Sequence, residues 1–489
     1  MAEPARPVWL PDLSDAPGPR YRAIADALAA AIESGDLAPG DKLPPHRTLA
    51  DALGVTVGTV TRAYGEAERR GLLEATVGRG SFVRRDRGGM AARTWLSAAP
   101  ATGTVLPTYE TGETGQMPAE SGDLIEMSVN YPASDFLAGA LLPGLAALGA
   151  DTTRLTALAG YQPSAGRPEH RATGARWLGR FGLDATADEI VPVHGTQGGL
   201  TVVLSTLVAP GETLLVEDLT WPGVHRIAIR YGLTLVPVRR DEEGLCPDAL
   251  ARSARQTGAR AVYLMPTLHN PLNTIMPDAR RDALIAVARS ENLILVEDDI
   301  YGFLADHPPA PLAARDPDRA VYVTSLSKCV APGLRFGFVK APPALVPRLA
   351  QAVAIDTIMV SPLLAELATH LIESGHADAC ATAQRTEALK RQTLARRLLP
   401  LRLPAGSEAS FHIWLPMPEG WRSERFVTEA RARGVVLTPG STFHVDGGDP
   451  GAVRLCLPAE PDHTRLEAGL KIIAGLLTHA PHQAAMPMV

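Results

Sequence analysis

One stretch around a lysine offers the clearest chemistry in this sequence. Residues 324–337 read TSLSKCVAPGLRFG, so Lys328 follows Ser325 and Ser327 closely and precedes Arg335 by seven residues. A lysine amine can form a Schiff base with an aldehyde, and two hydroxyls with a guanidinium can hold a phosphate. The stretch therefore predicts pyridoxal phosphate attached to Lys328, with Ser325, Ser327 and Arg335 at its phosphate.

Two further segments follow expected strands and could contact the same cofactor. Residues 195–199 form a glycine-rich turn entering a helix, where free N–H groups and the helix dipole favour phosphate. Thr196 and Gln197 are the candidates there, although such turns also simply join strands to helices. Trp221 follows another expected strand and could stack on a pyridine ring, although a lone tryptophan is more often a core residue.

Three side chains complete the expected cofactor site. Asn270, before Pro271, could donate its amide to the 3-oxygen of the ring, and Tyr301 could contact the same oxygen. Asp298 could face the pyridine nitrogen and keep it protonated, which makes the ring an electron sink; helix capping is the alternative for an aspartate at a strand end. We therefore expect Lys328, Asp298 and Tyr301 to be the catalytic residues.

These candidates are predicted to lie together because each follows or ends a strand. Apolar runs that alternate with helical stretches predict strands at Ile190–Val193, Thr213–Val216, Ala261–Met265, Leu293–Val296 and Val321–Thr324. Such alternation predicts an α/β fold with a mostly parallel sheet covered by helices on both faces. Ligands of such sheets bind beyond the C-terminal ends of the strands.

The N-terminal residues have the pattern of a different fold. Helical spacing predicts helices over residues 20–34, 47–53 and 57–70, and residues 72–83 alternate and turn at Gly78-Arg79-Gly80 as a two-stranded wing would. These are the parts of a winged helix-turn-helix. From Lys42 to Arg87 the sequence has nine lysines and arginines and five acidic residues, a local net charge of +4, which suits a nucleic-acid partner. The alternative is a helix-turn-helix that serves for dimer packing or as an appendage of an enzyme.

Composition sets the wider limits. The 489-residue chain predicts two or three domains, and its 46% hydrophobic and 20% charged residues are typical of an ordinary soluble protein. No apolar run is long enough to span a bilayer and no secretory signal is visible, so we expect a cytoplasmic protein without membrane contact. The four cysteines lack paired spacing, which argues against disulfides and a zinc site, and we expect no metal.

The first 85 or so residues resemble the DNA-binding domain of the GntR regulators. The resemblance rests on the stretch from Ile32 to Arg47, on Leu49–Val55 and on the wing Gly78–Val83. In that family Arg47, the start of the third helix and the wing contact DNA. The resemblance therefore implies that a double-stranded DNA operator is contacted by Arg47, Thr56, Thr59, Arg62 and Arg79. One departure concerns base preference: the recognition helix opens Thr56-Val-Gly-Thr-Val60, without the arginine that the family usually has there.

Residues 125–480 look like a fold-type I aminotransferase of the aspartate and aminoadipate group, with a smaller C-terminal α+β domain. The resemblance implies that Tyr161, in Tyr161–Gly166, reaches the cofactor phosphate of a partner subunit and that Arg454 binds a substrate α-carboxylate. It also implies a homodimer. We expect the DNA-binding domain of each subunit to cross to the effector domain of the other subunit. His269 replaces the usual glutamine before Asn-Pro, and Leu272-Asn273 replaces Thr-Gly, which leaves substrate shape open.

The combination resembles a MocR-type regulator. We expect a GntR-type DNA-binding domain at residues 14–84, a linker at 85–124 and an aminotransferase-like effector domain at 125–480. The favoured function is a transcriptional regulator that senses an amino acid or pyridoxal phosphate itself through Schiff-base chemistry at Lys328. The alternative is a working aminotransferase with an accessory DNA-binding domain, and the sequence does not separate sensing from turnover.

Overall fold

The chain divides into two compact units, residues 1–106 and 107–489. The computed structural model describes residues 9–11, 13, 19–34, 36–37, 40–69, 72–76, 80–83, 124–133, 137–399 and 407–478.

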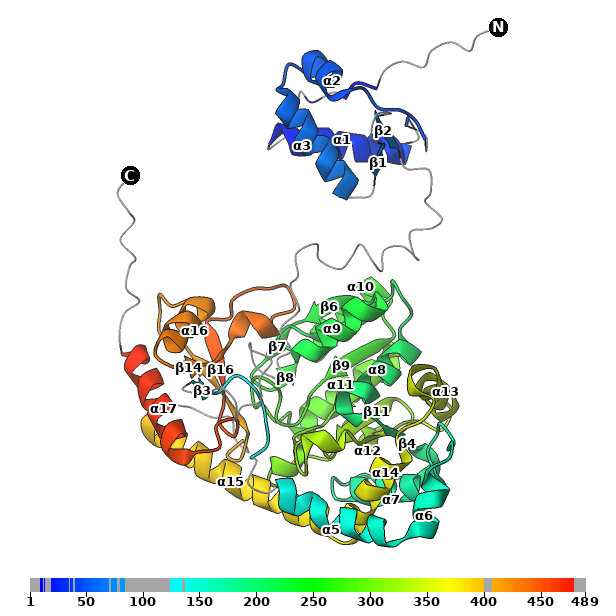
Figure 1. Cartoon of the computed structure of the whole chain (residues 1–489), viewed down its shortest axis with the longest axis vertical. Helices are drawn as coiled ribbons and strands as arrows, with labels where there is room; N and C mark the ends of the chain where they lie inside the picture. The colour runs from blue at the N-terminus through cyan, green and yellow to red at the C-terminus, as the bar shows by residue number, and fades with distance from the viewer. Residues whose placement is uncertain are drawn as a thin grey trace. The chain divides into compact units, whose positions relative to one another are not determined.

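The N-terminal unit is a winged helix-turn-helix (Figure 1). Its elements are α1 (Arg20–Ser34), α2 (His46–Leu53), α3 (Val57–Arg69), β1 (Leu73–Thr76) and β2 (Gly80–Val83). Apolar residues of α1 at helical spacing, such as Ile24 and Leu28, pack with Val60 and Tyr64 of α3 in one buried cluster. Gly54 ends α2 in the left-handed conformation (φ 64°), which a glycine adopts without strain and which allows the sharp turn into α3.

The predicted helices and wing strands are confirmed to within a residue or so. Strands β1 and β2 pair antiparallel, with Thr76 opposite Gly80. The turn that joins them, including Arg79, lies outside the described residues, as does nearly all of the expected linker.

A seven-stranded sheet forms the centre of the second unit (Figure 1). In spatial order its strands are β4 (Ile190–Val193), β12 (Gly337–Lys340), β11 (Ala320–Ser325), β10 (Ile294–Asp298), β9 (Ala261–Leu264), β5 (Thr213–Glu217) and β6 (Thr234–Val238). Strands β11, β10, β9, β5 and β6 run parallel, whereas β12 is antiparallel to both of its neighbours. The prediction of a mostly parallel sheet is confirmed.

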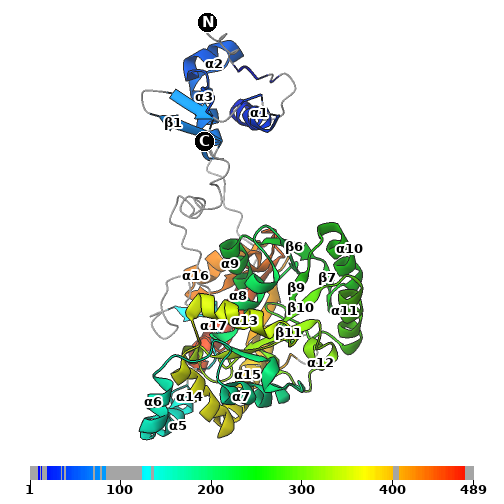
Figure 2. The same cartoon turned by 90° about the vertical axis from the view of Figure 1, so that its right-hand side faces the viewer.

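Helices cover both faces of this sheet. They are α7 (Pro168–Gly179), α8 (Gly195–Leu207), α9 (Pro222–Tyr231), α10 (Pro247–Thr257), α11 (Asp278–Ser290), α12 (Leu312–Arg315) and α13 (Val346–Thr357). Figure 2 shows α10, α11 and α12 beyond one face and α8 and α13 beyond the other. Except for β6, the strands are buried on both faces, which is why they read as continuous apolar runs. Helices α5 (Leu137–Ala150), α6 (Thr152–Leu158) and α14 (Pro362–Glu373) pack beside α7.

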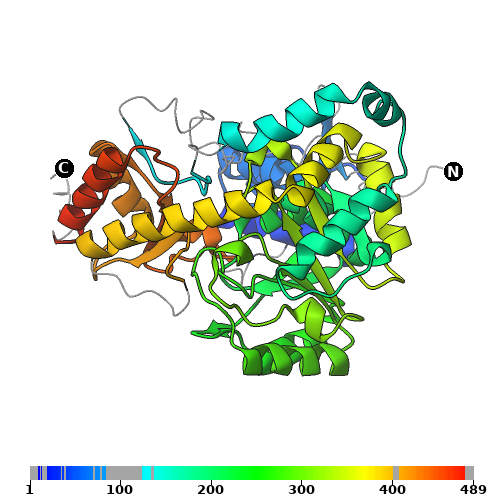
Figure 3. The ribbon, with the colours of Figure 1, turned by 90° about the horizontal axis from the view of Figure 1, so that it is seen from below.

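A smaller domain is built from residues 124–133 and 407–478, and we call it the small domain. Its elements are β3 (Ile125–Glu126), β13 (His412–Pro416), α16 (Ser423–Ala432), β14 (Val435–Val436), β15 (Thr438–Pro439), β16 (Ala452–Cys456) and α17 (His463–Leu477). It has its own apolar core. The 23-residue helix α15 (His376–Leu398) runs from α14 and α5 to α17 and so joins this domain to the large sheet (Figure 3).

Two strands of the large sheet escaped the sequence analysis. β6 contains Pro237 and is only partly buried over most of its length, so its apolar signal is weak. β12 has four residues and begins two residues after Arg335, inside the stretch interpreted as a cofactor motif. Among the described residues, a search for helices long and apolar enough to cross a membrane finds none.

Gly174 allows α7 to pack closely on the sheet edge that leads to the site. A Cβ at this position would lie 2.6 Å from Phe338 Cδ1 and 2.8 Å from Ile190 Cγ2. We therefore expect Gly174→Ala to lower the stability of this unit by about 1–3 kcal/mol through overpacking. Gly179→Ala, in the same helix with no atom within 4 Å of its Cβ, is the control and should leave the melting temperature nearly unchanged. Calorimetry of the full chain checks both; equal melting temperatures would contradict the packing argument.

Candidate functional site

A cavity of about 480 Å³ opens where the C-terminal ends of the strands face the small domain. Nearly all residues predicted for the cofactor site line it, although they come from segments far apart in the sequence. These are Thr196, Gln197, Trp221, Asn270, Asp298, Tyr301, Ser325, Ser327, Lys328, Arg335 and Arg454.

One end of the cavity has the groups that a phosphate requires. Helix α8 begins at Gly195, so the N–H groups at its start are free of helical partners. The Thr196 hydroxyl donates to Ser325 Oγ at 3.0 Å, and the Ser327 backbone N–H donates to the same oxygen at 3.3 Å. The Ser327 hydroxyl is buried without a hydrogen-bond partner among the described residues. A phosphate placed here would accept hydrogen bonds from the free N–H groups and from the Ser327 hydroxyl.

Arg335 lies at the same end in an unusual backbone conformation. Its φ of 43° is in the left-handed region, which a non-glycine residue rarely occupies without a structural or functional reason. A Cβ on Gly195 (φ 70°) would lie 3.2 Å from the Arg335 guanidinium and 3.5 Å from Ser327 Oγ. The glycine therefore keeps open the space between the start of α8, the guanidinium and the serine hydroxyl.

The lining of the cavity also presents a buried carboxylate. Asp298 ends β10 and accepts a hydrogen bond from the Tyr263 hydroxyl on Oδ2 at 2.8 Å. Its Oδ1 is buried with no partner among the described residues. Burial raises the pKa of Asp298, the Tyr263 hydroxyl opposes this shift and the charge of Asp299 adds to it, so that the pKa is about 7. An N–H donor from a bound ring would satisfy Oδ1 and favour the ionised carboxylate.

Trp221 forms one wall of the cavity. It precedes Pro222, the first residue of α9, and a Cβ at Gly223 would lie only 2.0 Å from the indole ring. Only glycine at 223 therefore allows this position of the ring, which leaves a flat aromatic surface beside the cavity for stacking.

Lys328 also lines the cavity and is oriented by the small domain. Its ammonium group donates to the backbone oxygen of Asn130. The Asn130 side-chain amide in turn donates to Tyr301 Oη at 2.6 Å and contacts His412 Nδ1 at 3.0 Å. Burial, followed by the charge of Arg454, holds the pKa of His412 well below its usual value, so this imidazole is neutral. Burial also raises the pKa of Tyr301, which therefore stays a hydrogen-bond donor.

Arg454 enters the cavity from β16 of the small domain. It is 4% exposed and donates to Asn270 Oδ1 at 3.0 Å and to the Ser128 oxygen at 2.6 Å, with its guanidinium 4.8 Å from the centre of the Phe443 ring. Its Nε is buried without a hydrogen-bond partner among the described residues. Because Asn270 accepts through Oδ1, its amide nitrogen stays available to a ring oxygen, as the sequence analysis proposed.

Tyr161, which was also predicted to contact the cofactor, is not among the residues that line the cavity. It sits on the segment between α6 and α7 and is 82% exposed. A second hollow, of about 300 Å³, shares Gln197 and Arg335 with the first cavity and is bounded by Thr357 and Val360.

The predicted DNA contacts lie on the surface of the helix-turn-helix. Arg47, Thr56 and Arg62 are exposed and Thr59 is half-buried. Thr56 also has a structural use, because its hydroxyl accepts from the Thr59 N–H at 3.3 Å at the start of α3. The Arg62 guanidinium lies 5.6 Å from the centre of the Tyr21 ring.

Several residues of the cavity were missed by the sequence analysis. They are Asn130, Arg226, Thr438 and Phe443 in the lining, with Tyr263 and His412 directly behind it. Arg226 lies one helical turn after Pro222, so its spacing from Trp221 could have indicated it. The others come from the small domain or from within a strand, where no local pattern marks them.

Two family models match the chain. Residues 123–473 match the model described as "Aminotransferase class I and II". The chain belongs to this family. Residues 20–83 match "Bacterial regulatory proteins, gntR family". The MocR-type arrangement expected from the sequence, a GntR-type winged helix followed by an aminotransferase domain, is thus confirmed, and the family implies dependence on pyridoxal phosphate.

Relatives share both parts. The chain is 30% identical to the uncharacterized HTH-type transcriptional regulator YdeF of Bacillus subtilis over 479 residues, which cover 96% of each protein. It is 29% identical to the vitamin B6 salvage pathway transcriptional repressor PtsJ of Salmonella typhimurium, over 88% of this chain and 92% of the relative. The fold is similar to that of LysN, an α-aminoadipate aminotransferase of Thermus thermophilus (TM-score 0.65, 23% identity, 73% of this chain and 92% of that one).

The side chains of the cavity fit pyridoxal phosphate. The start of α8 with Ser327 and Arg335 would hold the phosphate, Trp221 would stack on the ring, Asp298 Oδ1 would accept from the ring nitrogen, and the Lys328 amine would bind the aldehyde. Bound there, the group supplies a reactive carbonyl and an electron-withdrawing ring. The buried unpartnered oxygens of Asp298 and Ser327 are the observations on which this fit rests.

The raised pKa of Asp298 makes a prediction for the cofactor-free protein. Between about pH 4 and pH 7 the folded protein holds a proton that the unfolded chain has released. Stability should therefore fall as the pH rises through this window. The asparagine in the variant Asp298→Asn does not titrate. Across this window the free energy of unfolding of the wild type should therefore fall relative to that of the variant, by at most about 4 kcal/mol, and its melting temperature should fall with it. Thermal unfolding of both proteins across pH checks this; a constant difference would show that Asp298 keeps an ordinary pKa.

Proposed function

We propose that the protein is a pyridoxal-phosphate-dependent, DNA-binding transcriptional regulator whose aminotransferase-like domain senses an amino acid or the cofactor itself. One observation carries the proposal: Lys328 lines the same cavity as a phosphate cradle and a buried carboxylate, in a chain whose N-terminal unit exposes a helix-turn-helix surface. The names of YdeF and PtsJ as transcriptional regulators support the regulatory function.

The arrangement suggests how an amino acid would be sensed. Bound pyridoxal phosphate would supply a carbonyl carbon that holds one primary amine at a time, and Lys328 would compete with the amine of the effector for it. The effector carboxylate would bind Arg454. Switching a two-state protein from mostly one form to mostly the other needs a difference in binding of about 5.5 kcal/mol, which a covalent exchange with a guanidinium clamp can supply.

The two ends of such an effector would contact different parts of the fold. Lys328 follows β11 of the large sheet, whereas Arg454 lies on β16 of the small domain. An effector joined to the cofactor beside Lys328, with its carboxylate on Arg454, would favour one packing of the small domain against the large sheet. The signal to DNA would be this change in packing, transmitted to half-sites read by two winged helices. Occupancy by pyridoxal phosphate alone is the second form of signal, supported by the name of PtsJ.

We further propose a homodimer in which Tyr161 of the partner subunit reaches the cofactor phosphate. Its ring is 82% exposed. The hollow beside Gln197 and Arg335 gives a second protein chain access to the phosphate end of the cavity. Ile355, Ile358 and Leu363, which are 77%, 57% and 45% exposed near the same region, would be covered by the partner.

An active aminotransferase is the second candidate function. The cavity contains every group that transamination requires, including a lysine able to act as a general base. Low turnover can coexist with sensing. The two functions differ in what the protein does to DNA and in how fast it consumes an amino acid.

The DNA-binding assay tests the main proposal. A fragment selected by the protein from a random-sequence library serves as operator, and affinity is followed by fluorescence anisotropy over a range of salt. We expect one amino acid, or pyridoxal phosphate, to change the affinity of the wild type by about tenfold or more, as is typical of allosteric coupling. Lys328→Ala should lose the response to amino acids and the visible absorbance of bound cofactor. Lys390→Ala, an exposed lysine on α15, is the control.

The opposite result supports the enzyme. Amino-acid conversion at rates of about 1 per second or faster, with no DNA affinity above the non-specific level, would overturn the regulatory proposal. A wild type that takes up no pyridoxal phosphate would overturn both.

Mixed dimers test the shared site. Tyr161→Phe should weaken cofactor binding by about tenfold, because a hydrogen bond to a charged phosphate is lost. A dimer of one Tyr161→Phe chain and one Lys328→Ala chain keeps one intact site only if the tyrosine acts across the interface. Purified through two different tags, it should bind one cofactor with wild-type affinity. Weak binding in the mixed dimer would place Tyr161 in its own subunit's site. Unchanged affinity in the Tyr161→Phe homodimer would place it outside any site.

A further inference from the structure

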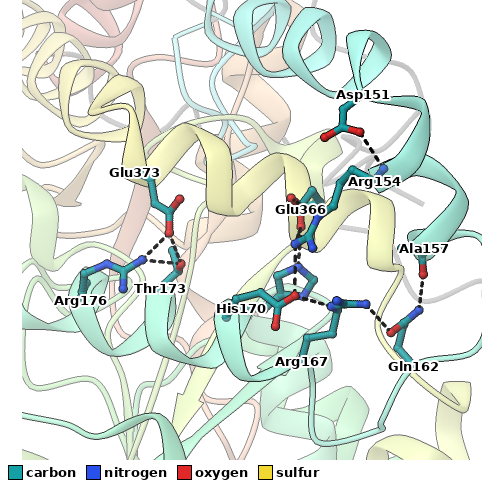
Figure 4. A network of polar contacts seen from close by, with 11 residues as sticks. Asp151, Arg154, Ala157, Gln162, Arg167, His170, Thr173, Arg176, Glu366 and Glu373 are labelled. Carbon is teal, nitrogen blue, oxygen red and sulfur yellow. Dashed lines mark hydrogen bonds and ion pairs between the residues drawn. The ribbon is translucent and has the colours of Figure 1, made fainter.

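A cluster of charged side chains lies beside the segment that carries Tyr161. We call Arg154, Arg167, Glu169, His170 and Glu366 the anchor cluster (Figure 4). Its members come from α6, from α7 and the residue before it, and from α14. No function described so far uses it.

Arg167 connects this cluster to residues 160–166. Its Nε donates to Glu169 Oε1 at 2.5 Å and its Nη1 donates to Gln162 Oε1 at 2.9 Å. The other side of the Gln162 amide donates to the Ala157 and Gly160 oxygens at 2.9 and 3.1 Å. Both the oxygen and the nitrogen of the Gln162 amide are thus hydrogen-bonded (Figure 4). This fixes the side chain of the residue that follows Tyr161.

The remaining contacts hold Arg167 in place. Arg154 donates to both oxygens of Glu366, at 2.8 and 2.6 Å, and to Glu169 at 3.2 Å. His170, which is 3% exposed, contacts Glu366 at 2.9 Å. Burial raises the pKa of Glu169, but a backbone hydrogen bond and Arg167 outweigh it and bring the pKa to about 2, so this carboxylate is charged at any physiological pH. Partly buried, multiply paired charges of this kind are fixed more firmly than single surface ion pairs.

The backbone of the same segment is held as well. The Gln162 N–H contacts Met359 Sδ at 3.0 Å. Gly166 has a φ of 84°, and a Cβ there would lie 2.6 Å from the Pro192 side chain. The segment is therefore fixed in shape while the Tyr161 ring at its tip stays exposed, as expected for a side chain held ready for a partner.

A neighbouring ion pair shows what a merely structural link between the same helices looks like. Arg176 of α7 pairs with Glu373 of α14, as Figure 4 shows, and both are more than half exposed. This pair joins α7 to α14 as the anchor cluster does, but none of its recorded contacts reaches residues 160–166. Arg176 is therefore a matched control for Arg167.

We propose that Arg167 is a positioning residue for the cofactor site of the partner subunit: it fixes Gln162, and through it the place at which Tyr161 meets the partner's phosphate. The inference rests on the proposed function, in which the two subunits share a site. Arg167 of one subunit would thus affect the cofactor that is attached to Lys328 of the other subunit.

Cofactor titration of the full-length dimer tests this. Arg167→Gln should raise the dissociation constant of pyridoxal phosphate by about fivefold, because the charge-assisted hydrogen bond that fixes Gln162, and through it Tyr161, is lost. Arg176→Gln should leave the constant within about twofold of the wild type, the range expected for an exposed pair. Sedimentation and thermal unfolding establish that both variants remain folded dimers. If Arg167→Gln does not assemble, Gln162→Ala replaces it and should weaken binding similarly.

The decisive measurement uses mixed dimers. An Arg167→Gln chain paired with a Lys328→Ala chain has its only lysine site beside an unaltered Tyr161 segment, so one cofactor should bind with wild-type affinity. A chain with both changes, paired with a wild-type chain, should show the weakened affinity at the one remaining site. A purely structural role would give the reverse pattern, because the defect would stay with the altered subunit.

The outcomes separate this inference from the proposed function. If the wild type binds no cofactor, or if Tyr161→Phe is not complemented in mixed dimers, the shared site itself is wrong. If both hold and Arg167→Gln binds like Arg176→Gln, or is not rescued across the interface, only the positioning function of Arg167 is overturned.

Discussion

The burial of the Asp298 carboxylate is the constraint around which the site is organised. One oxygen is paired with Tyr263 and the other has no partner among the described residues. A buried polar atom left unpaired costs about 1–3 kcal/mol, so a sequence selected for stability alone would place an apolar residue here. Its position at the end of β10, in one cavity with the start of α8, makes sense for a ligand with a positive N–H at one end and an anion at the other.

The rest of the cavity balances this one acid with several cations. Arg226, Lys328, Arg335 and Arg454 line it together with Asp298. Such an excess of positive charge would be unfavourable without anionic ligands, and a cofactor phosphate and an amino-acid carboxylate supply them. The division of these cations between the large sheet and the small domain means that neutralising them also draws the two parts together. An anionic ligand that contacts cations of both parts would therefore favour their close packing.

How much of this was predictable depends on the range of the interactions. The strands could be predicted because buried parallel strands are continuous apolar runs, and the site followed because its residues lie at strand ends. Asn130 and His412 could not, since they are 282 residues apart and meet only through packing of the small domain. The anchor cluster escaped for the same reason: Arg154 and Glu366 come together only where α6 meets α14.

The proposed sharing of the site between subunits has a consequence for regulation. If Tyr161 of the partner subunit contacts the phosphate, cofactor occupancy stabilises the dimer, and the dimer raises cofactor affinity, because linkage is reciprocal. Two winged helices read two half-sites only when they are held in one assembly. A cofactor site completed across an interface would thus make DNA affinity depend on vitamin B6 supply before any amino acid binds. An enzyme gains less from this coupling, since its chemistry needs only that the dimer persist.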